Sequence, residues 1–161
     1  MPYADELRTL AEIAVALAGF TGIVVALERR SAPSHSGTNR ARLRELLLSS
    51  LGVAFFAFMP TLLSGFSGDD RWAYRVSQVP FAAYHVLLMV LFFRSATIIQ
   101  LAMTEWLTLP LGLGTILLQL ATALGFFSNQ LYVVYFLGLL WLLFIACINF
   151  VVLLLPDEDA A

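Results

Sequence analysis

Charged residues are scarce in this chain: only 12% of its 161 residues are charged, whereas 60% are hydrophobic. The basic residues are all arginines, lysine is absent, and the formal net charge is −2. A nucleic-acid partner would require a basic surface, so this charge balance argues against one. A water-soluble domain of this size could not remove so much apolar surface from water.

Residues that catalyse reactions or bind metals are equally few. The single cysteine, Cys147, excludes an intrachain disulfide and a cysteine-based metal cluster, and the chain has two histidines. The sequence contains no HExxH motif, no pair of aspartates on a helix and no glycine-rich phosphate loop. We therefore expect no cofactor, no metal site and no enzymatic activity.

Long apolar runs are what the sequence does contain. A transmembrane helix needs about 20 mostly apolar residues, because the hydrocarbon core is roughly 30 Å thick and a helix rises about 1.5 Å per residue. The sequence therefore predicts an all-α integral membrane bundle with five transmembrane helices, in a single domain of residues 1–161. The predicted spans are residues 10–27, 46–66, 73–99, 107–127 and 131–155.

The first of these spans is the least certain, because its apolar run is short and Glu12 precedes it. The alternative is a re-entrant or interfacial helix, which would leave four full spans. We favour a true span, because Glu28, Arg29 and Arg30 end the apolar run sharply.

Segment 28–45 is the most basic part of the chain, and the positive-inside rule predicts that it is a cytoplasmic loop. Five spans then place the N-terminus outside and the C-terminus in the cytoplasm, and we expect a bacterial inner membrane. From Asn39 the pattern predicts that the second helix extends beyond the membrane. Three arginines there either bind anionic lipid headgroups, at about 1 kcal/mol each, or are a topology signal alone. They are Arg40, Arg42 and Arg44.

Five small or polar residues share one face of the fourth span, because they are spaced by four, three, four and three residues. They are Thr108, Gly112, Thr115, Gln119 and Thr122. In a membrane such a face must contact protein or water. It either lines a pore, where it replaces part of an ion's hydration shell, or holds helices together through hydrogen bonds of about 0.6 to 2 kcal/mol each.

His85 lies near the middle of the third span, about 18 Å from Ala73 along the helix. An ionisable side chain at this depth is a candidate functional group, and a proton-linked role would use a ring that titrates near neutral pH. The alternative is a neutral histidine with both ring nitrogens hydrogen-bonded. Gln78, Tyr84 or Gln119 could then be its partner.

Other ionisable residues lie near the ends of the spans. Glu12 is predicted to pair either with Arg75 of the third span or with Arg8, one helical turn away. Arg94 is expected at the inner interface, where it extends to the headgroups or forms an ion pair.

Small residues recur every four positions in the first span, which permits close approach of another helix. They are Ala14, Ala18, Gly22 and Ala26. The contact is either within the chain or between subunits. In the second span, Pro60 removes an intrahelical hydrogen bond and should bend the helix. Tyr132 and Tyr135 are expected in the outer headgroup belt.

Two functions fit these observations. A single chain of this size can hardly surround a water-filled path, so the first is a homo-oligomeric channel or passive conduit for small ions, surrounded by membrane lipids. The polar face of the fourth span would line its path. The second is a non-conducting interaction or scaffold subunit of a larger membrane complex.

Overall fold

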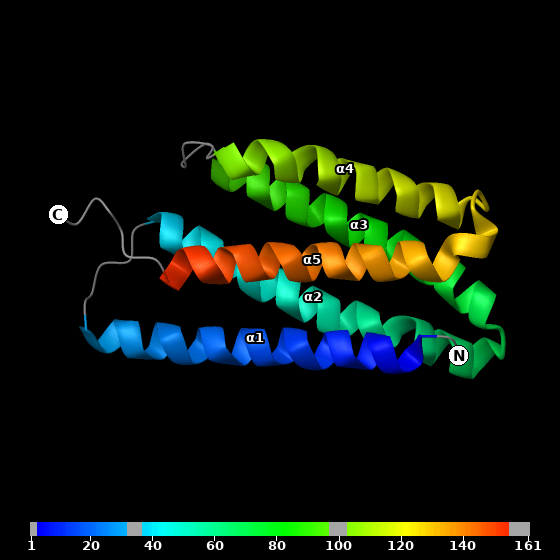
Figure 1. Cartoon of the computed structure of the whole chain (residues 1–161), viewed down its shortest axis with the longest axis horizontal. Helices are drawn as coiled ribbons and strands as arrows, with labels where there is room; N and C mark the ends of the chain where they lie inside the picture. Colours follow the sequence, from blue (N-terminus) through cyan, green and yellow to red (C-terminus); the bar gives the residue numbers. More distant parts are fainter. Residues whose placement is uncertain (1–2, 32–36, 97–102, 155–161) are drawn as a thin grey trace.

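The described residues form five long helices in a bundle, and each runs antiparallel to the helix that follows it in the chain (Figure 1). The computed structural model describes residues 3–31, 37–96 and 103–154. The elements are α1 (Ala4–Ser31), α2 (Gly37–Ser67), α3 (Asp70–Ala96), α4 (Met103–Ala123), the 3₁₀ turn η1 (Ser128–Gln130) and α5 (Leu131–Leu154). The described residues form helices and turns without a strand, which confirms the predicted all-α bundle.

Among the described residues, four helical stretches are long and apolar enough to cross a membrane. They are Ala4–Ala26, Ala41–Ser67, Asp70–Arg94 and Ser128–Leu154. Large apolar side chains face outward in the middle of the helices, among them Phe55 at 64% exposure and Leu117 at 60%. Water-soluble surfaces rarely carry extended patches of such residues. The helices therefore indicate a membrane protein.

The shortest apolar helix is α4, whereas we expected the first span to be the doubtful one. α1 already begins at Ala4, and its 28 residues measure about 42 Å. The apolar stretch of α4 that the structure describes, Thr108–Ala123, is shorter than the other four.

The expected end of the fourth span at residue 127 is wrong, because α4 ends at Ala123. The N–H of Phe126 donates to the carbonyl of Ala121 at 3.0 Å, and the N–H of Gly125 donates to that of Thr122 at 3.1 Å. This pair of bonds is a Schellman motif. Its central residue, Gly125, has a φ of 102°, which glycine adopts without steric cost.

Most of segment 28–45, which we expected to be a loop, is helical. α1 continues to Ser31 and α2 begins at Gly37, so the predicted extension of the second helix is confirmed. The side chain of Arg40 lies outside the described residues. Arg42 is half-buried and Arg44 is exposed on this extension. Their contact with lipid headgroups stays a prediction.

The antiparallel connections give the bundle two different ends. At the first, α1, α3 and α5 finish and α2 and α4 begin. We call it the arginine end, after Arg42, Arg44 and Arg94. At the opposite end, the Asp69 end, Asp69 Oδ1 accepts hydrogen bonds from the backbone N–H of Arg71 (2.9 Å) and Trp72 (3.2 Å). Asp69 thereby caps α3. Which end faces the cytoplasm stays a prediction.

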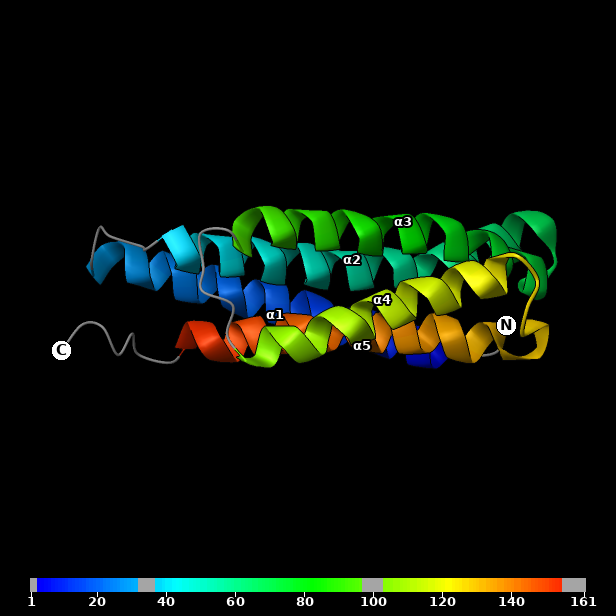
Figure 2. The ribbon, with the colours of Figure 1, turned by 90° about the horizontal axis from the view of Figure 1, so that it is seen from above.

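α2 and α5 form the centre of the bundle. α2 contacts α1, α3 and α5, whereas α4 contacts α3 and crosses α5 at an angle (Figure 2). Four buried rings from α2, α3 and α5 form what we call the aromatic block: Phe56, Tyr74, Phe81 and Tyr135. The ring centroids of Phe81 lie 4.8 Å from Phe56 and 5.0 Å from Tyr135.

Pro60 lies inside α2 without ending it. Proline has no N–H, so the carbonyl of Phe56, four residues earlier, loses its helical donor. Tyr135 of α5 replaces this donor, since its hydroxyl donates to the Phe56 carbonyl at 2.6 Å. Neighbouring side chains commonly compensate intramembrane prolines in this way. The expectation that Tyr135 lies in the headgroup belt is wrong, because its side chain is fully buried.

Replacing Tyr135 by phenylalanine should lower the free energy of unfolding by about 1–2 kcal/mol, because the Phe56 carbonyl is left buried without a donor. In a Pro60→Ala background the alanine N–H restores the helical donor, so the same replacement should cost much less. Unfolding in mixed detergent–SDS micelles measures both losses. Tyr132→Phe, at a half-buried position, is the matched control. Equal losses in the two backgrounds would contradict the assignment.

Candidate functional site

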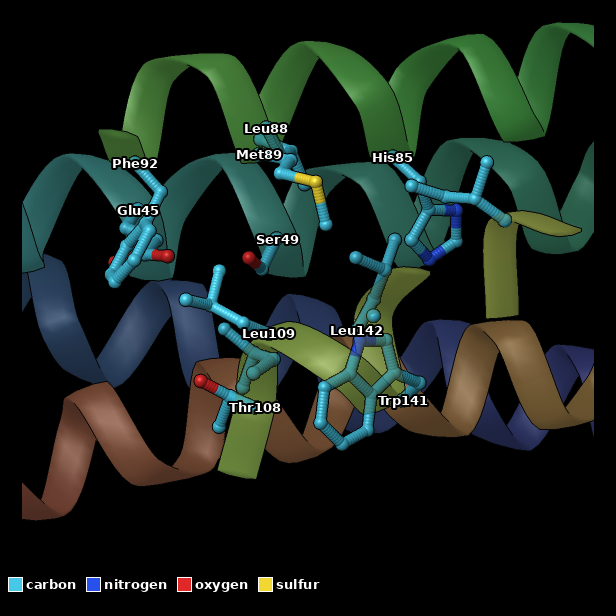
Figure 3. Close-up of a pocket in the computed structure, with 13 residues that line it drawn as sticks. Glu45, Ser49, His85, Leu88, Met89, Phe92, Thr108, Leu109, Trp141 and Leu142 are labelled. Carbon is cyan, nitrogen blue, oxygen red and sulfur yellow. The ribbon is translucent and has the colours of Figure 1, made fainter. Parts of the chain in front are cut away.

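A cavity of about 80 Å³ lies between α2, α3, α4 and α5. Glu45 lies at its end near the arginine end of the bundle, and His85 lies at the other end of the cavity (Figure 3). Ser49 and Thr108 add hydroxyl groups to the lining, which is otherwise mostly apolar. This volume is well above the minimum that a single water molecule needs, so the cavity has room for water.

His85 sits near the middle of the membrane-spanning part of α3. It is separated from Asp70 by about 22 Å of helix and from Arg94 by about 14 Å. Its side chain is only 5% exposed. An ionisable group is therefore placed deep in the bundle, at the inner end of a partly polar cavity.

The hydrogen bond of His85 defines its tautomer. Nδ1 lies 3.1 Å from the carbonyl oxygen of Phe81. A carbonyl oxygen only accepts, so Nδ1 carries the proton and Nε2 of the neutral ring holds the lone pair. Nε2 is buried and has no hydrogen-bond partner among the described residues. Gln119 and the Gly138 backbone lie beside the ring, so the alternative of a histidine satisfied through both nitrogens stays a prediction.

The amide of Gln119 lies beside the His85 ring and the backbone of Gly138. Gln119 is fully buried, and neither of its amide atoms has a hydrogen-bond partner in the part of the chain that is described. Gly138 permits this approach, because a Cβ there would collide with Gln119 Nε2 and with the ring of Phe81. Helices α3, α4 and α5 thus bring together the imidazole of His85, the amide of Gln119 and the backbone of Gly138.

The two other partners expected for His85 bind elsewhere. Tyr84 donates its hydroxyl to the carbonyl of Leu48 at 2.7 Å, and its ring lies so close to Gly52 that a Cβ there would collide with it. Gln78 donates Nε2 to the carbonyl of Leu131 at 3.3 Å. Both bonds link α3 to a neighbouring helix.

The predicted polar face of α4 points towards the protein. Thr108 and Gly112 line the cavity, and Gln119 and Thr122 are fully buried. The Thr122 hydroxyl lies 2.8 Å from the Gln119 carbonyl, so it is satisfied within its own helix. Thr115 is half-buried and lines an apolar groove between α4 and α5 instead of the cavity. The five residues therefore share a face but not a single path.

The predicted ion pair between Glu12 and Arg75 is wrong, and the alternative partner is the one that the structure shows. Arg8 Nε donates to Glu12 Oε1 at 3.0 Å, with both side chains largely exposed. Arg75 is exposed on α3, whereas α1 is packed against α2 and α5. Arg94 is exposed near the arginine end, as expected for a residue near an interface.

The stripe of small residues on α1 changes its environment along the helix. Ala14 is fully buried in the bundle and Ala18 is half-buried. Gly22 and Ala26 are exposed, and a Cβ added at Gly22 would meet no atom within 4 Å. The stripe therefore makes an intramolecular contact in its first half and leaves its second half open.

Sequence reasoning missed several residues of this site. Ser49 follows Glu45 by one helical turn at the start of an apolar run, a spacing that could have indicated a polar face. Ser49 and Ser50 are both buried with hydroxyl oxygens that have no partner among the described residues. Gly138 and Trp141 interrupt the apolar run of α5 without any periodic signal.

Comparisons with protein-family models, curated proteins and solved structures found no match to this chain. Across residues 3–31, 37–96 and 103–154, no group of three or more His, Cys, Asp or Glu could hold a metal ion. The groups that line the cavity therefore define the chemistry of the site.

Alanine at Gly138 should lower the free energy of unfolding by about 1–3 kcal/mol, because its Cβ forces the Phe81 ring and the Gln119 amide to move. Alanine at Gly114 of α4 is the matched control. There a Cβ meets no atom within 4 Å, and the change should be neutral or stabilise by up to about 1 kcal/mol. Chemical denaturation in detergent micelles measures both. Equal stabilities of the two variants would show that the close approach at Gly138 does not exist.

Proposed function

We propose that the protein is a conduit for small ions across a membrane, and that the path runs inside each chain, between α2, α3, α4 and α5. The observation that supports this proposal is the cavity that leads from Glu45 to His85, whose buried Nε2 has no hydrogen-bond partner among the described residues. A buried polar atom without a partner destabilises a fold, all the more inside a membrane. Its position at the end of a cavity favours a role in binding over a role in stability.

A path within the chain replaces the path between copies that the sequence suggested. Gln119 and Thr122 are fully buried by the chain's own helices, so no second copy is needed to cover them. The carboxylate of Glu45 favours cations over anions at the cavity, because a cation is attracted to a negative charge. Assembly as a homo-oligomer is still expected, but the path does not depend on it.

Conduction requires a second conformation. On the side of the Asp69 end, the cavity stops at the aromatic block, where the Phe81 ring lies 4.6 Å from the His85 ring. Phe81 and Tyr135 are fully buried and in contact. In the proposed conduit, this arrangement would close the path on one side.

Filling the cavity should block transport. Gly112 lines it, and a Cβ there meets Met89 Cε and Trp141 Nε1 at an ordinary 3.6 Å, so the further carbons of a leucine extend into the free volume. We expect Gly112→Leu to reduce ion flux in liposomes by about tenfold or more. Gly114→Leu, the same change on the outward face of α4, should leave the flux unchanged.

Fluxes of K⁺, Na⁺, H⁺ and Cl⁻ into liposomes that contain the purified protein measure this effect. Absence of flux for all four ions with the unaltered protein would overturn the proposal. Equal flux through the two leucine variants would show that ions do not pass the cavity.

A non-conducting interaction subunit is the second candidate. It is favoured by the second half of α1, where Gly19 and Gly22 have open space around them and Ala26 is exposed. Small residues let another transmembrane helix approach closely. If this surface binds a partner, Gly22→Leu should release a chain that co-purifies with the unaltered protein, and Gly114→Leu should not. Native mass spectrometry in nanodiscs distinguishes a partner chain from a second copy.

A further inference from the structure

We infer that the ion carried by this path is the proton, and that His85 binds it from the cavity. The inference rests on the proposed conduit and names its permeant ion. Three features of the site carry it: the lone pair of His85, the closure of the path by aromatic rings, and the polar groups around the ring.

The lone pair makes His85 a proton acceptor at the end of the cavity. Nδ1–H is held by the Phe81 carbonyl, so Nε2 is the nitrogen with the lone pair, and the ring must shift to expose this buried atom to the cavity. A hydronium ion in the cavity would transfer its proton to Nε2, where the ring's lone pair forms the new N–H bond. The broken O–H bond leaves its electron pair on a neutral water molecule. The resulting imidazolium donates from both nitrogens, and the oxygen of the adjacent Gln119 amide is an acceptor for Nε2–H.

The aromatic block favours a proton over a larger ion. A dehydrated K⁺ or Na⁺ ion needs several oxygen ligands to replace its hydration shell. Beyond His85 the path meets Phe81 and Tyr135, whose rings offer no such set and whose only hydroxyl already donates to Phe56. A proton needs a single acceptor at each step, which His85 supplies on the cavity side.

Polar groups from three helices surround the His85 ring. They are the Phe81 carbonyl of α3, the Gln119 side chain of α4 and the Gly138 backbone of α5. Of the described residues that line the cavity, Glu45 and His85 are the titratable ones, and they lie at opposite ends of it. The Glu45 carboxylate adds negative charge at the far end of the cavity, which attracts a cation into it.

Release towards the Asp69 end requires the ring of Phe81 to move. In that direction on α3, Tyr84 already donates its hydroxyl to the Leu48 carbonyl, and the polar group beyond it is Gln78, two helical turns from His85. Its Oε1 atom is buried and has no partner among the residues that the structure describes. It can therefore accept a hydrogen bond from a water molecule that carries the released proton.

Ion selectivity of the unaltered protein is the first test, and it needs no variant. In planar bilayers the reversal potential should shift by about 59 mV for each tenfold change in proton concentration. It should not respond to gradients of K⁺, Na⁺ or Cl⁻. A reversal potential that follows one of these ions overturns the inference and leaves the proposed conduit standing. Bilayers without any protein-dependent current overturn both.

The second test removes the acceptor. His85→Gln keeps a polar side chain of similar size that does not titrate, and it should lower proton flux into liposomes by about tenfold or more. His35→Gln, at the other histidine of the sequence, is the matched control and should keep full flux. Full proton flux through a folded His85→Gln protein overturns the inference.

If His85→Gln does not fold, the ¹⁵N NMR spectrum of the His85 ring in the unaltered protein tests whether the ring binds a proton. The expected spectrum shows an Nδ1–H tautomer at high pH and a second ring proton at the pH at which proton flux occurs. A ring that stays neutral throughout that range overturns the inference.

Discussion

The hydrogen bond from the Tyr135 hydroxyl to the Phe56 carbonyl joins the two central helices, and the rest of the bundle is arranged around it. Inside a membrane each backbone polar group needs a partner from the protein, because lipid tails offer none. Pro60 frees one carbonyl on α2, and the residue that satisfies it must come from the helix beside it. This requirement places Tyr135 next to Phe56 and brings Phe81 against both, so that one proline determines where the aromatic block forms.

The candidate site does not meet the requirement that each polar group inside the membrane has a partner from the protein. Around His85, Ser49 and Gln119 the polar atoms are buried but not paired within the described chain, although each lies within a well-packed bundle. Gly138 allows the Gln119 amide to reach the imidazole, so a missing side chain on one helix creates the contact between two others. The site therefore combines the aromatic block with polar groups that could bind a ligand. This combination is the basis of the transport role that we propose.

Much of the architecture was predictable from residue patterns, because hydrophobic length and spacing act locally. The apolar runs predicted the helices, and the spacing of Thr108, Gly112 and Gln119 predicted a face that contacts protein or water. The partner of Glu12 could not be chosen in this way, since Arg8 and Arg75 were both plausible until the packing of α1 was known. The burial of Tyr135 was missed because a tyrosine near the end of a span is usually an interfacial residue.

By itself the sequence determined that this chain forms apolar helices with a few polar residues on defined faces, since composition and period depend on neighbouring residues alone. Only the tertiary structure decided which of those residues meet. His85, Ser49, Gln119 and Gly138 come from four different helices, and their distances depend on how those helices pack. The cavity and the tautomer of His85 follow from that packing. The sequence could not predict them, because contacts between distant residues and backbone acceptors produce no periodic pattern in it.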